Sequence, residues 1–337
     1  SVPRRLPIKP SFTAPSARTT CEMIGSPIAW TAGYTGAGSR VAIIDTGTDT
    51  DHQSFNSSAF DYALEQDAVR AGKTAEEYVK GLHLLNVAEI TEVWPELNIS
   101  SFNYQPEQTY LNTKLPFAFN YVDTNLDVVH DNDSQGEHGS HVSGIAVANR
   151  YLKRGEEFVS AMDAVHMVGN APDAQIIVMK VFGATRAGVS DDIVAALEDA
   201  MTLGCDVANL SLGSTAGFTS SDTELDLIYE RIASQDIIVA IAAGNDGTSS
   251  ANNLWGTNKN PTAHPDNAVI GSPAIYPNAT AVASANNANG MSPYFTYGET
   301  KVAYTESRGL KVQILKSYSL SPGMSSCREL PRAINSS

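Results

Sequence analysis

Three polar residues stand at the ends of apolar segments and are of the types that catalyse acyl transfer. Asp45 closes the apolar run RVAIIDTG at 40–47, where a carboxylate can accept a hydrogen bond from an imidazole and fix its tautomer. His138 begins the segment HGSHVSG, whose small residues let a partner side chain and a substrate backbone come close. Asn245 ends the segment AAGN, and its amide can donate a hydrogen bond to an oxyanion.

Each of these residues, taken alone, also has a simpler structural explanation. Asp45 can open the turn before Gly47, and Asn245 can occupy a turn in a left-handed conformation. The tripeptide DTG also occurs in aspartic proteases, which need two copies or a small β-rich homodimer, whereas this chain has one copy. His138 and His141 have i, i+3 spacing, which is weak evidence for zinc without a carboxylate or cysteine pattern nearby.

A fourth segment, NLSLGS at 209–214, reads as the end of a strand followed by a glycine turn. The exposed edge of such a strand can pair with an extended peptide. The sequence alone leaves open whether this edge binds a peptide or only turns the chain.

The elements that must position these residues alternate along the chain. Apolar strands followed by amphipathic helices predict a parallel sheet with right-handed crossovers, and ligands bind such sheets at the carboxyl ends of the strands. The helix expected at 190–204 has Ser190 and two aspartates at its start and Gly204 at its end, as helix caps require. The expected strands are 40–47, 175–182, 205–213, 236–245 and 278–285, and the expected helices are 138–150, 190–204 and 222–235.

Three stretches depart from this alternation. Residues 1–20 are rich in Pro, Ser, Thr and Arg and indicate an extended lead-in without a signal-peptide core. Residues 52–130 have no single period, contain a helical stretch near 62–85, and suggest an insertion over a sheet edge or a site. Residues 286–337 indicate an irregular, poorly packed tail. A domain at 21–285 is therefore expected to hold the functional site.

Composition narrows the class of function. The chain has 337 residues, of which 42% are hydrophobic, so a sizeable core is expected. A formal charge of −15 argues against binding nucleic acid or anionic membranes. The three cysteines are too few and too far apart to indicate a disulfide framework or a zinc site. No apolar run approaches the roughly 20 residues that would span a bilayer.

The order of the four motifs resembles that of the subtilisin-like serine proteases, the subtilase family. The resemblance covers about 21–50 and 136–285. It is strongest to the cell-envelope proteinases of Gram-positive bacteria, of the lactocepin and C5a-peptidase type, through the segments GYTGAGSRVAIIDTG, FNYVDTN and GSPAIYPNATAVAS. It implies an α/β, subtilisin-like three-layer fold with a mostly parallel central sheet and helices on both faces, incomplete at its C-terminus, with 286–337 as the start of a protease-associated insert.

The same resemblance assigns the residues of the site. Asp45 matches the aspartate of the catalytic triad, His138 the general base and Asn245 the oxyanion donor. The segment Ser211, Leu212 and Gly213 matches the edge that pairs with the substrate backbone. His141 is expected to be structural and to pack inside its helix.

The nucleophilic serine is not evident. The family carries it in a GTSMA-like segment that opens a helix, and the nearest string here is GMSS at 323–326, where Met replaces Thr and an apolar helix does not follow. Ser325 and Ser326 are poor candidates. The resemblance therefore implies a serine endopeptidase of the subtilase family whose serine segment is missing from this chain, so that the chain alone is inactive. The alternative is an inactive fragment or pseudoprotease that binds extended peptides.

The resemblance also implies the partners and the location of the protein. Polypeptides are the expected substrates, neither nucleic acid nor a membrane-spanning segment is expected, and the protein is expected to be secreted or at the cell surface. No cofactor is required. Calcium is a structural ion in many subtilases, and the acidic loops Asp49/Asp51 and Asp131/Asp133 are the places considered for it, although such pairs are commonly solvated turns.

Overall fold

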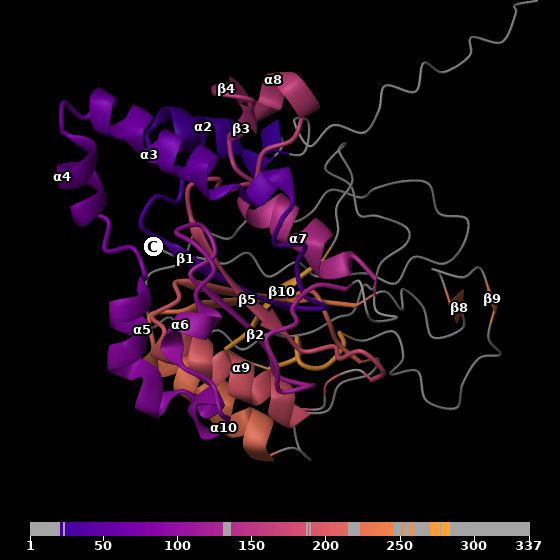
Figure 1. Ribbon diagram of the computed structural model, residues 1–337. Coiled ribbons are helices and arrows are strands. Elements are labelled where there is room, and N and C mark those ends of the chain that lie inside the picture. The colour runs from indigo at the N-terminus through magenta and orange to yellow at the C-terminus, as the bar shows by residue number, and fades with distance from the viewer. Residues whose placement is uncertain are drawn as a thin grey trace, which may run out of the picture.

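The computed structural model describes residues 21–22, 24–130, 136–186, 188, 190–214, 223–244, 251–252, 257–258, 270–276 and 278–283. The expected lead-in and tail, 1–20 and 286–337, lie outside the described residues (Figure 1). The strands are β1 (Arg40–Asp45), β2 (Phe117–Asn120), β3 (Tyr151–Arg154), β4 (Glu157–Ser160), β5 (Gln175–Lys180), β6 (Val207–Leu210), β7 (Ile238–Ala242), β8 (Ala251–Asn252), β9 (Thr257–Asn258) and β10 (Thr280–Val282). The α-helices are α2 (Ser26–Thr31), α3 (Ser57–Arg70), α4 (Ala75–Lys80), α5 (Val87–Val93), α6 (Pro106–Thr109), α7 (His138–Val147), α8 (Ala161–Val165), α9 (Ser190–Thr202) and α10 (Thr223–Ser234), and the 3-10 helices are η1 (Gln53–Phe55), η2 (Trp94–Glu96) and η3 (Asn98–Ser101).

Six strands form one sheet in the order β10–β7–β6–β1–β5–β2, and all of its strand pairs are parallel. The mostly parallel sheet and all five expected strands are thus confirmed. β1 lies in the middle, between β5 and β6, and its last residue Asp45 is in register with Lys180, the last residue of β5. The carboxyl ends of these parallel strands all lie at the same end of the sheet as Asp45.

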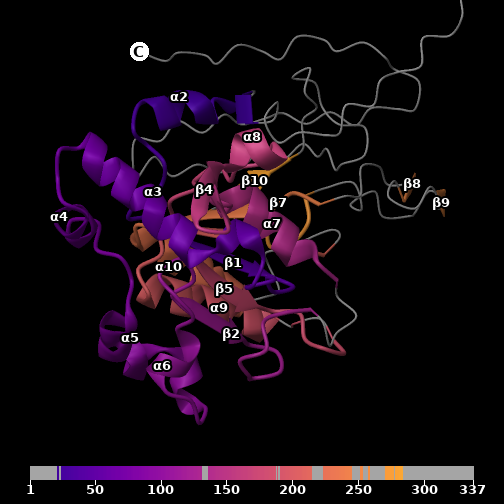
Figure 2. The same ribbon diagram turned by 45° about the horizontal axis from the view of Figure 1, so that its top comes forward.

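The sheet is covered on both faces, which confirms the three-layer architecture (Figures 1 and 2). Side chains of β1 alternate between the faces, as the twofold period of a strand requires. Ala42 and Ile44 pack in the cluster that includes residues of α5, α9 and α10, whereas Val41 and Ile43 pack in the cluster that includes Val147 of α7. This double burial explains why the β1 sequence is apolar at successive positions.

The stretch 52–130 differs from the expectation in two ways. The helical stretch near 62–85 is two helices, α3 and α4, because the chain turns at Gly72, whose φ is +67°, and a capping box of Thr74 and Glu77 starts α4. No strand was expected here either, yet β2 pairs with β5 and forms an edge of the central sheet. The stretch therefore contributes to the sheet as well as covering it.

A buried carboxyl group connects α9 to the elements beneath it. Asp199 is fully buried, and its Oδ2 accepts a hydrogen bond from the Tyr121 hydroxyl at 2.9 Å. Its Oδ1 accepts hydrogen bonds from the main-chain and side-chain nitrogens of Asn98, at 2.7 and 3.0 Å. Burial raises the pKa of Asp199 to about 6, and the hydrogen bonds offset only part of this effect.

We expect Asp199→Asn to remove a pH dependence of stability. Because its folded-state pKa is raised, the Asp199 carboxyl favours the folded state at low pH, and this contribution is lost as the pH rises from about 4 through about 6. The loss is at most about 3 kcal/mol. Urea unfolding at about pH 4.5 and about pH 7.5 should show a smaller fall in stability with rising pH in the variant than in the wild type. The exposed Asp191→Asn is the control, and equal slopes in wild type and Asp199→Asn would contradict the prediction.

Candidate active site

Asp45 and His138 lie side by side at the carboxyl end of β1. The side chain of Asp45 is 1% exposed, and its Oδ1 lies 2.7 Å from His138 Nδ1. The same oxygen accepts a hydrogen bond from the main-chain N–H of Thr46, also at 2.7 Å. The structure therefore brings together two of the three residues for which a catalytic role was predicted.

The hydrogen bond defines which nitrogen of His138 is free. An ionised carboxylate only accepts, so the proton lies on Nδ1, and Nε2 of the neutral ring is left as an acceptor. The His138 side chain is 53% exposed, which leaves the ring open to a reacting group. The hydrogen bond with Asp45 raises the pKa of His138, partial burial of the ring opposes this, and the charge of Asp45 adds to the increase. This is the arrangement of a general base held by a carboxylate.

Two glycines let α7 approach the turn after β1. A Cβ on Gly139 would lie 2.0 Å from the carbonyl oxygen of Gly47, and a Cβ on Gly47 would lie 2.1 Å from the carbonyl oxygen of Val128. Gly47 also has a φ of +106°, which favours glycine. The third residue of DTG and the second residue of α7 are therefore in direct main-chain contact, which places His138 over Asp45.

Side-chain hydrogen bonds fasten the same two segments. Thr46 Oγ1 accepts from the main-chain N–H of Gly139 at 2.9 Å, and Ser140 Oγ accepts from the N–H of Asp49 at 2.8 Å. The hydroxyl groups of Thr48 and Ser143 are 2.8 Å apart. The small polar residues of DTGTD and HGSHVS thus join the start of α7 to the end of β1.

The segment with Ser211, Leu212 and Gly213 follows β6 at the same end of the sheet. The next residue, Ser214, pairs with Ser272, since each main-chain N–H donates to the other residue's carbonyl, at 2.8 and 3.0 Å. Gly213 is needed here because a Cβ would lie 2.8 Å from the Ser272 carbonyl oxygen. The end of β6 is therefore anchored by the loop that precedes β10.

Comparison with known proteins decides between the alternatives for DTG. The model of the subtilase family of peptidases, described as "Subtilase family", matches residues 36–322. The chain belongs to the subtilase family. This subtilase has a subtilisin-like α/β fold with a parallel sheet, and the aspartate of its DTG segment lies beside a histidine. Neither feature fits the aspartic-protease alternative for DTG.

Relatives of this subtilase include both long proteinases and subtilisins. The PIII-type proteinase of Lactococcus lactis subsp. cremoris (strain SK11) is 34% identical over 259 residues, which cover 75% of this chain and 11% of the relative. The PII-type proteinase of Lacticaseibacillus paracasei is 33% identical over 272 residues, or 80% of this chain and 12% of the relative. Subtilisin E of Bacillus subtilis (strain 168) is 25% identical over 276 residues, or 82% of this chain and 48% of the relative. The chain thus spans only about a tenth of the length of the long proteinases that it matches.

Several residues for which a role was predicted or considered cannot be compared with the structure. Asn245, Ser325 and Ser326 lie outside the described residues, as do Asp131 and Asp133. In the part of the subtilase that the structure describes, no group of three or more His, Cys, Asp or Glu side chains is placed to hold a metal ion. Likewise, none of its described helices is long and apolar enough to cross a membrane. Cys21 and Cys205 are both buried and unbridged.

The prediction for His141 is wrong. We expected this side chain to pack inside the helix, but it is exposed. The reason is the helical period: the buried residues of α7 are Gly139, Ser143, Gly144 and Val147, which lie on the face toward the sheet, and His141 lies between them on another face.

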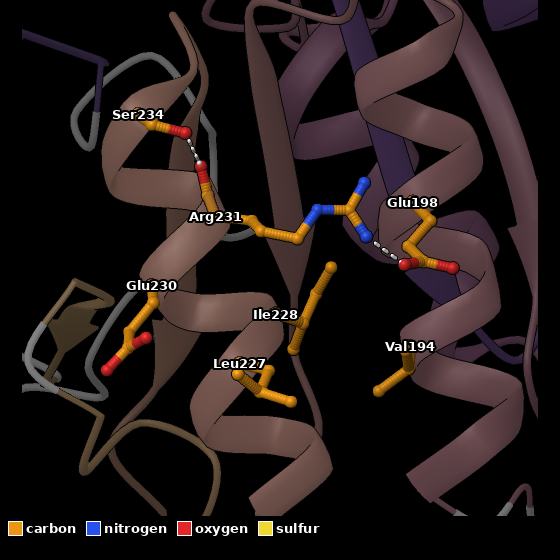
Figure 3. A pocket seen from close by; sticks show the side chains of 7 residues that line it. All are labelled: Val194, Glu198, Leu227, Ile228, Glu230, Arg231 and Ser234. Carbon is orange, nitrogen blue, oxygen red and sulfur yellow. Dashed lines mark hydrogen bonds and ion pairs between the residues drawn. The ribbon is translucent and has the colours of Figure 1, made fainter.

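A groove of about 530 Å³ lies between α9 and α10 and is separate from the candidate active site (Figure 3). Val194, Leu227 and Ile228 form its apolar part, and an ion pair of Arg231 with Glu198 crosses it. These two helices cover the face of the sheet opposite α7. The groove therefore contributes no group to the Asp45–His138 pair.

The sequence predicted no role for three residues that shape the site: Thr46, Gly139 and Lys180. The buried Nζ of Lys180 donates a hydrogen bond to the carbonyl oxygen of Thr46 at 2.5 Å. A signal for Lys180 existed, because a lysine inside the otherwise apolar run IIVMKVF at 176–182 is unusual in a strand buried on both faces. No comparable signal marks Thr46, whose partners come from segments far away in the sequence.

Proposed function

We propose that this chain is part of the catalytic domain of a serine-type endopeptidase, with the domain at 21–285 and an inserted region at 52–130. Asp45 orients the base, His138 is the base, and Asn245 is the oxyanion donor. The observation that carries the proposal is the 2.7 Å contact of His138 Nδ1 with the buried Asp45 at the carboxyl end of β1. The subtilase family supports it, since the family consists of peptidases.

In the proposed reaction, a serine oxygen attacks the carbonyl carbon of the peptide bond while His138 Nε2 takes the serine proton. Asp45 holds the ring and stabilises the imidazolium that forms. The Asn245 amide and a main-chain N–H donate hydrogen bonds to the developing oxyanion. His138 then gives its proton to the leaving amine, and water releases the acyl group by the same steps in reverse order. The mechanism uses protein groups and water and requires no cofactor.

We further propose that the chain by itself is catalytically inactive. Among the described residues, no serine side chain is hydrogen bonded to His138. The match to the family model ends at residue 322, ahead of Ser325 and Ser326. Neither serine stands in a GTSMA-like segment. The nucleophile is therefore the one part of the catalytic set that we assign to no residue of this chain.

A second function is favoured by the main chain after β6. In the described part of the protein, the main-chain groups of Ser211, Leu212 and Gly213 form no hydrogen bond with other main-chain groups. Such groups can pair with an extended peptide, as in the addition of a strand to a sheet edge. An inactive subtilase that keeps this segment would be a peptide-binding protein.

Three measurements on the purified chain test both functions. We expect no labelling by a fluorophosphonate probe and no hydrolysis of an unstructured protein, because we assign the serine that both require to no residue of this chain. Labelling that is lost in His138→Ala, or hydrolysis that phenylmethylsulfonyl fluoride blocks, would show that the chain does hold a nucleophile.

We expect an extended fluorescent peptide to bind, and its N-methylated counterpart, which cannot pair as a strand, to bind far more weakly. Equal binding of the two peptides would contradict pairing at Ser211–Gly213.

For the whole protein we propose polypeptide substrates and a location outside the cell, secreted or at the cell surface, as in cell-envelope proteinases. The observation behind this proposal is the match to long proteinases of lactic acid bacteria over most of the present chain. Calcium as a structural ion stays a proposal without a site assigned to it. Fractionation of the host cells, with the protein detected in culture medium or cell wall, tests the location.

A further inference from the structure

All functional groups of Thr46, the residue after Asp45, are engaged in positioning the candidate pair. Its main-chain N–H donates to Asp45 Oδ1 at 2.7 Å. Its Oγ1 accepts from the N–H of Gly139 at 2.9 Å and donates to the carbonyl of Gly136 at 3.2 Å. Its carbonyl oxygen accepts from Lys180 Nζ at 2.5 Å. Thr46 thus links β1, the start of α7 and β5 at one point.

Lys180 is the member of this group that needs an explanation. It ends β5, beside Asp45 in the parallel register, and is 1% exposed. Burying an ammonium group is costly unless it is hydrogen bonded, so the contacts of Lys180 must offset that cost. Its stem also packs against the turn, since a Cβ on Gly47 would lie 3.2 Å from Lys180 Cδ. The lysine therefore fixes both the carbonyl of Thr46 and the path of the chain through Gly47.

We propose that Lys180 is a positioning residue of the site, which acts through Thr46 to hold Asp45 and His138 in hydrogen-bonding geometry. The hydrogen bond from a charged ammonium to a carbonyl is stronger than one between neutral groups. It fixes the plane of the peptide that follows Thr46, and with it the direction of the Thr46 N–H toward Asp45 and of Oγ1 toward Gly139. This inference rests on the proposed function, because a positioned pair matters only if Asp45 and His138 act together.

The test is Lys180→Met, which keeps the length and apolar stem of the side chain and removes the donor. The readouts are the His138 pKa, followed by NMR of labelled histidine, and the downfield resonance of the Nδ1 proton. We expect the pKa of His138 to fall toward the ordinary value for histidine and the downfield resonance to weaken or disappear. The direction of the change is informative, because losing a nearby positive charge would by itself raise the pKa of His138, whereas a loosened hydrogen bond to Asp45 would lower it. An unchanged or raised pKa overturns the proposal.

Lys114→Met is the matched control. Lys114 is also fully buried, and its Nζ donates to the carbonyls of Pro172 and Ala174, which lie at the opposite end of β5. Both variants are expected to lower the thermal unfolding midpoint, but only Lys180→Met should change the His138 signals. A change of the same size in both would mean that general destabilisation, and not positioning, moves His138, and would overturn the proposal.

Two further measurements keep the outcomes distinct. Asp45→Asn should lower the His138 pKa whether or not Lys180 positions the pair. If Asp45→Asn does not lower the His138 pKa, the proposed function fails. If Asp45→Asn lowers this pKa while Lys180→Met leaves it unchanged, only the role of Lys180 fails. If Lys180→Met is not recovered folded, the wild type decides: the carbonyl ¹³C resonance of Thr46 should follow the titration of His138, and a resonance that stays constant overturns the proposal.

Discussion

Gly139→Ala is expected to destabilise the protein by about 3 kcal/mol or more, although alanine is the better helix former. Gly139 lies in the first turn of α7, where propensity alone would favour alanine by about 1 kcal/mol. The introduced methyl group, however, would lie 2.0 Å from the Gly47 carbonyl oxygen and 3.0 Å from the Gly47 nitrogen. Both atoms belong to the main chain, so no side-chain rotation can relieve the contact, and α7 must move away from the turn after β1.

Chemical unfolding of the two proteins measures this effect, with Gly81→Ala as the matched control. Gly81 follows α4 with a φ of −77°, and a Cβ there would meet only the Tyr78 and Glu77 carbonyl oxygens, at 3.4 and 3.7 Å. The control should therefore stay within about 0.5 kcal/mol of the wild type. A Gly139→Ala protein as stable as the wild type would show that α7 does not pack against Gly47 as described.

Asp45→Asn is expected to abolish the capacity of His138 to act as a base, with little change in shape. Oδ1 of Asp45 contacts both the Thr46 N–H and His138 Nδ1, and an amide cannot serve both. With its NH₂ group at that position, the amide donates to His138 Nδ1 and loses the hydrogen bond from the Thr46 N–H. The neutral ring then carries its proton on Nε2, which is the nitrogen that must accept a proton from a nucleophile. The pKa of His138 should fall toward the ordinary value for histidine, since the carboxylate that raises it is lost.

The same substitution should change the pH dependence of stability in a defined direction. Because the folded-state pKa of His138 is raised, protonation of the ring favours the folded state; this contribution is complete below the unfolded-state pKa and is lost as the pH rises through the folded-state pKa. The stability difference between wild type and Asp45→Asn should therefore be larger at about pH 5.5 than at about pH 8.5. NMR titration of His138 and urea unfolding at both pH values check it. A difference that grows with pH would contradict the assigned pair.

The central sheet could be predicted because its strands carry their own signal. Buried parallel strands are apolar at successive positions, and the helix at 190–204 has capping residues at both ends. β2 was missed because four residues, Phe117–Asn120, are too few to show a period, and only pairing with β5 makes them a strand. The hairpin of β3 and β4 was missed for a similar reason, since both strands are short and partly exposed.

The residues of the candidate site likewise differ in whether the sequence could predict their roles. Asp45 and His138 could be found because residue type, motif order and position at a strand or helix end agree. Thr46 and Lys180 could not be assigned a role, because their contacts join residues 46, 139 and 180, and no local pattern encodes that meeting. The exposure of His141 was predictable from the period of α7 once the buried face was known, but the sequence alone did not say which small residues face the sheet.

The central position of β1 has a consequence for synthesis of the chain. Among the described strands β1 is made first, yet its two neighbours, β5 and β6, are complete only after residue 210. Contacts so distant in sequence form late, because the intervening chain must first be ordered. A nascent chain on the ribosome therefore has His138 before it has the strands that hold Asp45 in place. The pair can meet only when most of the domain exists, so any hydrolytic capacity of the fold is withheld from the chain that is still being made.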